Sequence, residues 1–248
     1  MLNWFKTELH VHTCLSPCAD ILMSPRKIVA EVLRQQISII AITDHNSADN
    51  ALAVMKAAAK AGIVVLPGME VCTREEVHVL AIFENSASAL CLQSWVYDHL
   101  KGRNDPEVFG LQVVANEMDQ VDRFEDKLLI GATDLSIEET VAKLHELDGL
   151  AIAAHIDREG FGIIGQLGFI PETLRLDALE VSSNTTDEDA ATRYGMYEKY
   201  TFIRNSDAHF LNQIGKNSTR FLLGEPSFAE IRKALQKQDG RTVQTIFS

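Results

Sequence analysis

Histidine and acidic side chains recur along this chain at positions whose spacing suits metal binding. His10 and His12 lie two residues apart within Thr7 to Thr13, a segment with the composition of a β-strand. Because residues i and i+2 of a strand face the same side, both imidazoles are expected to point in one direction. Two imidazoles on one face make half of a metal site, although a lone His-x-His pair is also common by chance.

The same residue types recur in or directly after other strand-like runs. In a β/α barrel the strands end at one mouth, where active sites lie, and buried imidazoles and carboxylates need polar partners or metal ions. We therefore expect six of the eight histidines and two acids to converge there, while His99 and His145 fall on expected helices and are predicted to be solvated. The converging groups are His10, His12, His45, Glu70, His78, His155, Asp207 and His209.

The elements that must position these groups alternate along the whole chain. Strand-length apolar runs separate segments with helical periodicity, a pattern typical of βα units and a mainly parallel sheet. This many strands in 248 residues favours a closed or nearly closed barrel, which leaves no sheet edge exposed. Strands are predicted at 7–13, 38–43, 63–66, 77–83, 150–154, 178–182, 201–204 and 220–223. Helices are predicted at 24–35, 48–61, 87–100 and 188–199, and capping boxes at Ser136–Glu139 and Ser227–Glu230 open two more.

One stretch, 101–131, breaks this alternation. It is polar, contains Gly102, Pro106 and Gly110, and has weak periodicity. We interpret it as an insertion within a single domain spanning 1–248, placed where it could shape or cover a site.

The overall composition limits the partners. Acidic residues outnumber basic ones by 35 to 23, giving a formal net charge of −12, which disfavours a broad phosphate-tracking surface and hence long duplex nucleic acid. No apolar run reaches the length of a membrane span, and the first residues lack the apolar region of a signal peptide. A cytoplasmic protein without a membrane partner is expected, and the oligomeric state is not indicated.

Two short motifs have competing interpretations. Cys14 and Cys18 could begin a structural zinc knuckle, but no second pair matches them, which strongly favours bystander thiols of a reducing compartment. The run Gly160–Gly165 satisfies the Gly-x-Gly-x-x-Gly pattern of dinucleotide-binding loops. It does not directly follow a strand, however, and Pro171 limits any helix it could open, which favours a glycine-rich loop near the metal groups instead.

Taken in order, the motifs resemble those of the polymerase and histidinol phosphatase (PHP) superfamily. They cover essentially the whole chain, and the resemblance implies an α/β fold, a distorted (β/α)7 TIM-like barrel, with a trinuclear metal centre that hydrolyses phosphoesters. The motifs are His10-x-His12, Thr43-Asp44-His45-Asn46, Gly68-x-Glu70, Glu76-Val77-His78, His155 and Ser206-Asp207-Ala208-His209.

The resemblance also implies a ligand set. One metal would take His10, His12, Glu70 and Asp207, with Glu70 bridging to a second metal held by His78 and His155; a third would take Asp20, His45 and His209. Asp20 departs from the family pattern, because it lies eight residues after the His-x-His pair rather than about five. Cys18 or a water could replace it, and Asp20 would then be a solvated loop acid.

The implied activity is that of a hydrolase acting on phosphoric ester bonds through a metal-activated hydroxide. Mixed imidazole and carboxylate ligands suit up to three zinc, manganese or iron ions. Asp44 is expected to orient an imidazole or to serve as a turn residue, and Arg158 to bind a substrate phosphate or to be a surface arginine. The expected partner is a small phosphorylated substrate, a nucleotide or a short oligonucleotide end.

Three other activities fit parts of the sequence. The same site could act as a 5′ to 3′ exonuclease on short oligonucleotides. A PHP module could instead bind metal without catalysis, although that case is usually marked by lost ligands. A metal-dependent amidohydrolase also uses His-x-His on a barrel, but it commonly adds a carboxylated lysine that no predicted strand end presents here.

Overall fold

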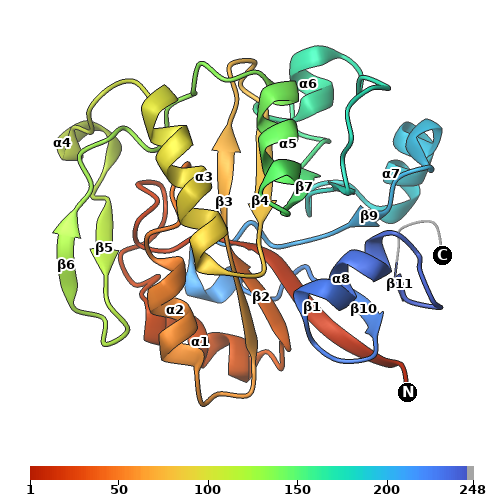
Figure 1. Ribbon diagram of the computed structural model, residues 1–248, viewed down its shortest axis with the longest axis horizontal. Coiled ribbons are helices and arrows are strands. Elements are labelled where there is room, and N and C mark those ends of the chain that lie inside the picture. The colour runs from red at the N-terminus through yellow and green to blue at the C-terminus, as the bar shows by residue number, and fades with distance from the viewer. Residues whose placement is uncertain (245–248) are drawn as a thin grey trace.

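The strands form one nine-stranded sheet that curls into a nearly closed barrel (Figure 1), which confirms the predicted α/β, TIM-like architecture. The computed structural model describes residues 1–244. In spatial order the strands are β11 (Thr242–Val243), β10 (Thr219–Leu223), β1 (Asn3–Val11), β2 (Ile39–Ile42), β3 (Val64–Cys72), β4 (His78–Ile82), β7 (Leu150–Ala153), β8 (Ala178–Glu180) and β9 (Phe202–Ile203).

The barrel closes at the end that carries the His-x-His pair. The backbone N–H of His12 donates to the carbonyl of Ala208 at 3.0 Å, and the N–H of Ala208 donates to the carbonyl of His10 at 3.2 Å. The first half of β1 pairs instead with β10, in antiparallel orientation. The backbone of the segment after β9 therefore joins β1 near His10 and His12, and side-chain hydrogen bonds join Asn205 to the N–H of Leu9 and Ser206 to Glu8.

Strand β4 runs antiparallel to both of its neighbours, β3 and β7, in a sheet whose other barrel strands are parallel. The cause is the short connection from Cys72 to His78, because a parallel crossover needs a dozen or more residues. The reversed direction places the start of β4, and with it His78, at the mouth where the parallel strands end.

Helices cover the outside of the barrel (Figure 1). Helix α1 illustrates why they form, since Ile28, Val29 and Val32 bury one face in the cluster that contains Ile40 and Ile42 of β2. The helices are α1 (Pro25–Arg34), α2 (Ala51–Ala58), α3 (Ser86–His99), α4 (Pro106–Phe109), α5 (Ile137–Glu146), α6 (Ile163–Leu167), α7 (Asp187–Tyr194) and α8 (Phe228–Leu235), with short turns η1 (Gly195–Tyr197) and η2 (Leu211–Gln213).

Only one of the two predicted capping boxes is complete. At α5, Ser136 accepts from the N–H of Glu139, and Glu139 accepts from the N–H of Ser136, so that prediction is confirmed. At α8, Ser227 accepts from the N–H of Glu230, but the Glu230 carboxylate turns to the N–H of Gly224 and to Arg241. The second predicted capping box is therefore wrong in one respect: the Glu230 carboxylate does not accept from the N–H of Ser227. The guanidinium of Arg241 is a stronger partner for that carboxylate than a backbone N–H.

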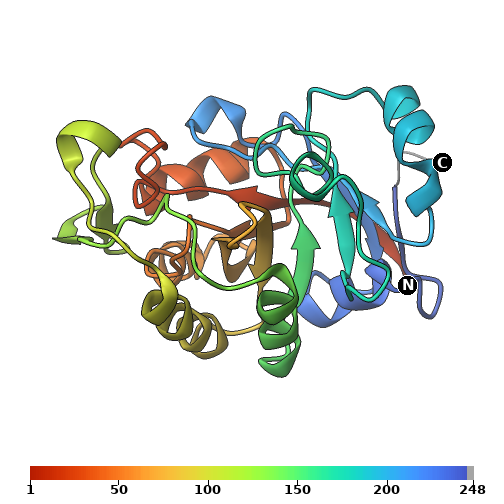
Figure 2. The ribbon, with the colours of Figure 1, turned by 90° about the horizontal axis from the view of Figure 1, so that it is seen from above.

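The 101–131 segment contains α4 and a hairpin of β5 (Val113–Ala115) and β6 (Val121–Phe124). The hairpin lies at one end of the molecule, opposite α7 (Figure 2). Asn50 fixes it by donating to the carbonyl of Val113 and accepting from the N–H of Ala115, both at 2.9 Å. Of this segment, only Ile130 reaches the cavity above the metal-capable groups, so the segment borders that cavity without covering it.

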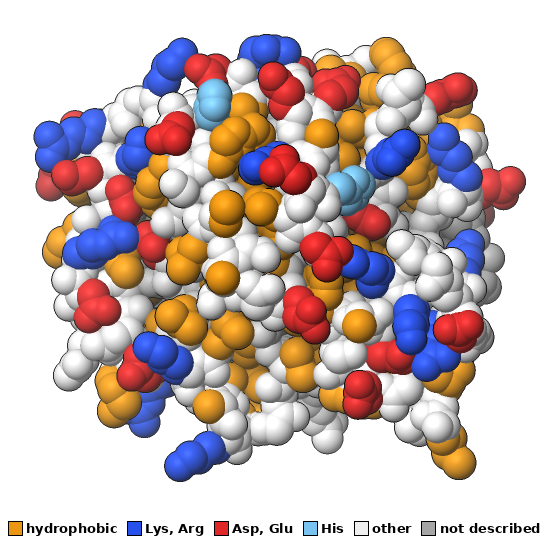
Figure 3. All heavy atoms as spheres, viewed as in Figure 1, with side chains coloured by type: hydrophobic (Ala, Val, Ile, Leu, Met, Phe, Trp, Pro, Cys, Tyr) orange, Lys and Arg blue, Asp and Glu red, His pale blue; other side chains and the backbone are white. Residues whose placement is uncertain are grey.

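The surface and the helices add two observations about partners. On the face shown in Figure 3, acidic and basic side chains are interspersed, with no broad basic area. Among residues 1–244, no helix is both long and apolar enough to cross a membrane.

Candidate metal centre

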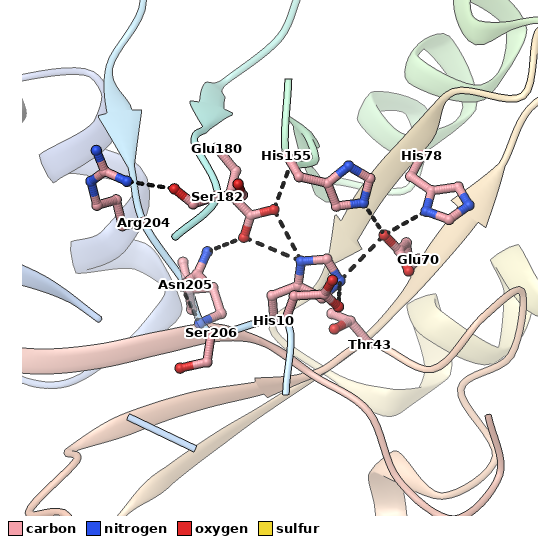
Figure 4. A network of polar contacts seen from close by, with 12 residues as sticks. His10, Thr43, Glu70, His78, His155, Glu180, Ser182, Arg204, Asn205 and Ser206 are labelled. Carbon is pink, nitrogen blue, oxygen red and sulfur yellow. Dashed lines mark hydrogen bonds and ion pairs between the residues drawn. The ribbon is translucent and has the colours of Figure 1, made fainter. Parts of the chain in front are cut away.

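The metal-capable side chains meet at one mouth of the barrel, and Figure 4 shows part of the cluster. His45, beside β2, bridges to Glu70 of β3, and His78 opens β4. All of the imidazoles except that of His209 are buried, as is Glu70. The structure brings together His10, His12, His45, Glu70, His78, His155, Asp207 and His209.

Glu70 lies at the centre of the cluster. Its Oε1 is 3.3 Å from Nε2 of His10, 2.8 Å from Nδ1 of His78 and 3.2 Å from Nε2 of His155. Its Oε2 is 3.1 Å from Nδ1 of His45 and 3.4 Å from Nε2 of His12. Burial by itself would raise the pKa of Glu70, but the surrounding imidazoles, led by His78, lower it well below its usual value. The Glu70 carboxylate is therefore charged.

Three of the donor atoms have the spacing of a metal coordination shell. His10 Nε2 and His12 Nε2 are 3.2 Å apart, and each is 3.2 Å from Oδ1 of Asp207. A tetrahedral ion with bonds of about 2.0–2.1 Å holds its ligands about 3.3 Å apart. Oδ1 of Asp207 is also buried and has no hydrogen bond, which a cation would remedy. The residues therefore fit a divalent ion at this position.

Hydrogen bonds outside the cluster turn the imidazole lone pairs inward. Nδ1 of His10 donates to the Glu180 carboxylate at 3.0 Å, and Nδ1 of His209 donates to the carbonyl of Asp207 at 2.9 Å. Carboxylates and carbonyls only accept, so Nδ1 carries the proton and Nε2 is left free as a ligand atom.

His12 is fixed in the same way through a hydroxyl. Ser16 Oγ donates to Oδ1 of Asp44 at 2.6 Å, so it must accept from Nδ1 of His12, which is 2.9 Å away. Asp44 also accepts from the N–H and hydroxyl of Thr13, both at 2.7 Å. Asp44 thus orients the imidazole of His12 through Ser16, and the same Ser16 hydroxyl also accepts from the backbone N–H of His45 at 3.2 Å.

A family model for the PHP domain matches residues 8–160, more than half of the chain. The chain belongs to the PHP domain family.

Two proteins similar to this PHP domain are considerably longer than it is. It is 31% identical over 106 residues to the uncharacterized protein YqxK of Bacillus subtilis, a match that covers 41% of this chain and 27% of YqxK. Its fold is similar to that of the lesion-specific endonuclease Q of Pyrococcus furiosus, with a TM-score of 0.71, 19% identity, and coverage of 97% of this chain and 58% of that one. This PHP domain therefore spans less than two thirds of either protein.

A candidate metal-dependent phosphoesterase from Bifidobacterium adolescentis matches along its whole length. It has a TM-score of 0.63 and 16% identity, and the match covers 94% of this chain and 96% of the other. Endonuclease Q has also been solved with a 27-mer duplex that holds an abasic lesion at the active site.

The predicted third ligand set is only partly assembled in this PHP domain. His45 and His209 lie together, and His12 completes a group of donor atoms within 4.8 Å of one another. Asp20 is not among these donors, although its backbone N–H donates to the carbonyl of His209 at 2.9 Å, and one oxygen of its carboxylate accepts from the N–H of Leu22 at 2.7 Å. The thiol of Cys18 instead contacts His45.

Arg158 lies at the rim and contacts a predicted ligand. Its Nη1 is 2.7 Å from Oδ2 of Asp207, the oxygen that faces away from His10 and His12. The side chain is 36% exposed and lines the cavity above the cluster. Arg158 therefore holds Asp207 in place while its other N–H groups are available to a ligand.

Several residues that build the site were not predicted from the sequence. Glu180 accepts from His10, from Asn205 and from the N–H of His155, and Glu8 accepts from the N–H and hydroxyl of Ser206. The available signal was an acid inside an apolar strand, in Ala178–Glu180 and in β1, since a buried acid requires partners.

The glycine-rich loop serves chain packing. A Cβ at Gly162 would lie 2.5 Å from the carbonyl oxygen of Arg158, and a Cβ at Gly165 would lie 2.3 Å from that of Glu159. Helix α6, which follows, has five residues. The loop places Phe161 at the cavity, which agrees with the predicted position near the metal groups and not with a dinucleotide site.

Proposed function

We propose that this PHP domain is a metal-dependent phosphoesterase that hydrolyses a phosphomonoester or nucleotide phosphate. The observation that supports it most is the convergence of six imidazoles with Glu70 and Asp207, three of those imidazoles having Nε2 freed by an outer hydrogen bond. Family membership supports the same class of activity.

The predicted ligand sets give a centre of up to three ions, zinc, manganese or iron. His10, His12, Glu70 and Asp207 would hold the first, with Glu70, His78 and His155 for the second and His45 and His209 for the third. Bound divalent ions supply Lewis acidity that polarises a phosphoryl oxygen and lowers the pKa of water. Asp20 stays a candidate ligand of the third ion through the carboxylate oxygen that does not accept from Leu22.

The protein's own groups would bind and orient the phosphate. Arg158 presents guanidinium N–H groups at the cavity and can pair with phosphoryl oxygens in a charge-assisted contact. The cavity measures about 190 Å³, below the roughly 300–1000 Å³ usual for whole small-molecule ligands. This volume suits a phosphoryl group and the group directly attached to it. It favours a substrate whose terminal phosphate enters the cavity while the rest of the molecule stays outside.

A nucleic-acid substrate is the second candidate. The fold similarity to endonuclease Q covers almost the whole of this chain, although that enzyme has a further portion that this chain does not match. Hydrolysis at the end of a short oligonucleotide would use the same centre and needs no extended basic surface.

A substrate screen tests the proposal. The manganese-loaded and zinc-loaded protein is assayed with phosphomonoesters, nucleoside bisphosphates, short oligonucleotides and a duplex containing an abasic site. We expect the protein to hydrolyse at least one of these substrates at a terminal phosphate, and we expect His10→Ala/His12→Ala to abolish this turnover. The matched control is His99→Ala/His145→Ala, because these imidazoles pair with Asp134 and Asp177 outside the cluster. Turnover that survives in the first variant would refute the mechanism, and metal binding without turnover of any substrate would indicate a non-catalytic module.

A further inference from the structure

Phe161 is an aromatic side chain held at the cavity in an unfavourable backbone conformation. Its φ is +63°, in the left-handed region that bulky residues avoid. Its carbonyl accepts from the N–H of His78 at 2.9 Å, which ties the loop to the first residue of β4. Strain of this kind persists where the surrounding structure enforces it, and it is concentrated at ligand sites.

The ring of Phe161 has one covered face and an exposed remainder. It stacks on the His78 imidazole with centroids 4.5 Å apart and planes 21° apart, yet the residue is 41% exposed. A core phenylalanine would be buried, so packing in the core does not account for this placement.

A second apolar side chain lines the same cavity. Ile130 is 36% exposed. Asn46 fixes its position, donating at 2.8 Å to the carbonyls of both neighbours, Leu129 and Gly131. The cavity thus has charged and metal-capable groups, including Arg158 and Asp207, together with apolar side chains from two separate segments.

We infer that Phe161, with Ile130, binds a nucleobase attached to the phosphate, so that the site selects nucleotides over phosphorylated sugars. This inference rests on the proposed phosphoesterase function. A planar base can stack on the ring of Phe161, as bases do on aromatic side chains of nucleic-acid-binding proteins. The aliphatic side chain of Ile130 offers an apolar contact, while the phosphate remains with Arg158.

The test compares two substrates that differ only by the base, adenosine 5′-monophosphate and ribose 5-phosphate. The variant is Phe161→Asn, because asparagine tolerates positive φ and lacks the aromatic ring. We expect the ratio of kcat/KM for the nucleotide to that for the sugar phosphate to fall about 10- to 100-fold, the range for loss of one stacked base. Phe161→Trp should restore the ratio, and Phe169→Ala, which removes an exposed phenylalanine that does not line the cavity, should not change it.

The outcomes separate this inference from the proposed function. If Phe161→Asn lowers kcat/KM for both substrates equally, the ring only shields His78 and the inference is overturned. If the wild-type protein hydrolyses neither compound, the proposed function fails for this class. Calorimetry then measures the binding of the two compounds to the manganese-loaded protein. Tighter binding of the nucleotide by the wild-type protein, lost in Phe161→Asn, supports the inference. Equal affinities for the two compounds contradict it.

Discussion

Nδ1 of His10 donates to the carboxylate of Glu180 at 3.0 Å, and both side chains are buried. Burial by itself would raise the pKa of Glu180, but His10 and its other partners lower it, so this acid is charged and only accepts. That relationship fixes which nitrogen of His10 faces Glu70 and Asp207. Glu180, which is not a predicted ligand, thus sets the tautomer of the predicted metal ligand His10.

Replacing Glu180 by Gln should weaken metal binding without removing a predicted ligand. A glutamine can donate to Nδ1 of His10 and so favour the tautomer that carries its proton on Nε2. We expect the affinity for the tightest ion to fall about 10- to 100-fold, as for other outer-shell carboxylates. Competitive chelator titration measures this, with Glu172→Gln, an exposed acid, as the control. Equal affinities in the two variants would contradict the tautomer argument.

Removing the hydroxyl of Ser16 should destabilise the protein as well as loosen His12. Ser16→Ala leaves Asp44, Nδ1 of His12 and the backbone N–H of His45 each short of one buried hydrogen bond. The expected loss in free energy of unfolding is about 1–3 kcal/mol. Urea denaturation of the metal-free protein gives the value, compared with Ser94→Ala on the exposed side of α3, which should lie within about 0.5 kcal/mol of wild type. A Ser16→Ala protein as stable as that control would show that the hydroxyl is dispensable.

Arg158→Ala should raise KM for the phosphorylated substrate while metal is retained. The guanidinium contacts Asp207 through the oxygen that faces away from the imidazoles, so the facing oxygen keeps its place in the cluster. We expect KM to rise about 10-fold or more, the effect of losing one charge-assisted phosphate contact. Steady-state kinetics with metal analysis checks this, and Arg175→Ala serves as the exposed control. An unchanged KM would exclude phosphate binding by Arg158.

The four cysteines should divide into two reactive and two protected thiols. Burial raises the pKa of Cys14 and of Cys72 to about 12, whereas Cys18 and Cys91 are exposed. Thiol reagents attack the thiolate, so the native protein should react rapidly at two positions and the unfolded protein at all four. Mass spectrometry of the alkylated peptides identifies them, and rapid labelling of Cys14 in the native state would contradict its buried placement.

The ion pair of Glu230 and Arg241 should make part of the stability depend on acid pH. Hydrogen bonds from Arg241 and from the N–H of Gly224 lower the pKa of Glu230 from 4.5 to about 2. A carboxyl with a lowered pKa stabilises the fold above its unfolded pKa, and this contribution is lost as pH falls through the folded value. Glu230→Gln should therefore reduce the free energy of unfolding by about 1–2 kcal/mol at neutral pH. The difference from wild type should shrink below pH 4.5, and a pH-independent difference would rule out the charge as its cause.

Much of the fold and most of the cluster could be predicted because both follow from local patterns. Alternation along β1 places His10 and His12 on one face, and apolar runs that must be strands end in His45 and in the segment before Asp207. A barrel then brings such ends to one mouth. The direction of β4 was not predicted, because it depends on the length of one turn and not on the composition of the strand.

The sequence by itself determined which residue types occupy the mouth of this barrel, since periodicity and strand ends are local properties. Only the tertiary structure decided how those groups are arranged. It turned Asp20 towards Leu22, connected Asp44 to His12 through Ser16, placed Glu180 behind His10, and laid Phe161 against His78. These contacts join segments far apart in the chain or depend on side-chain direction, and neither is encoded in the spacing of residues along one strand.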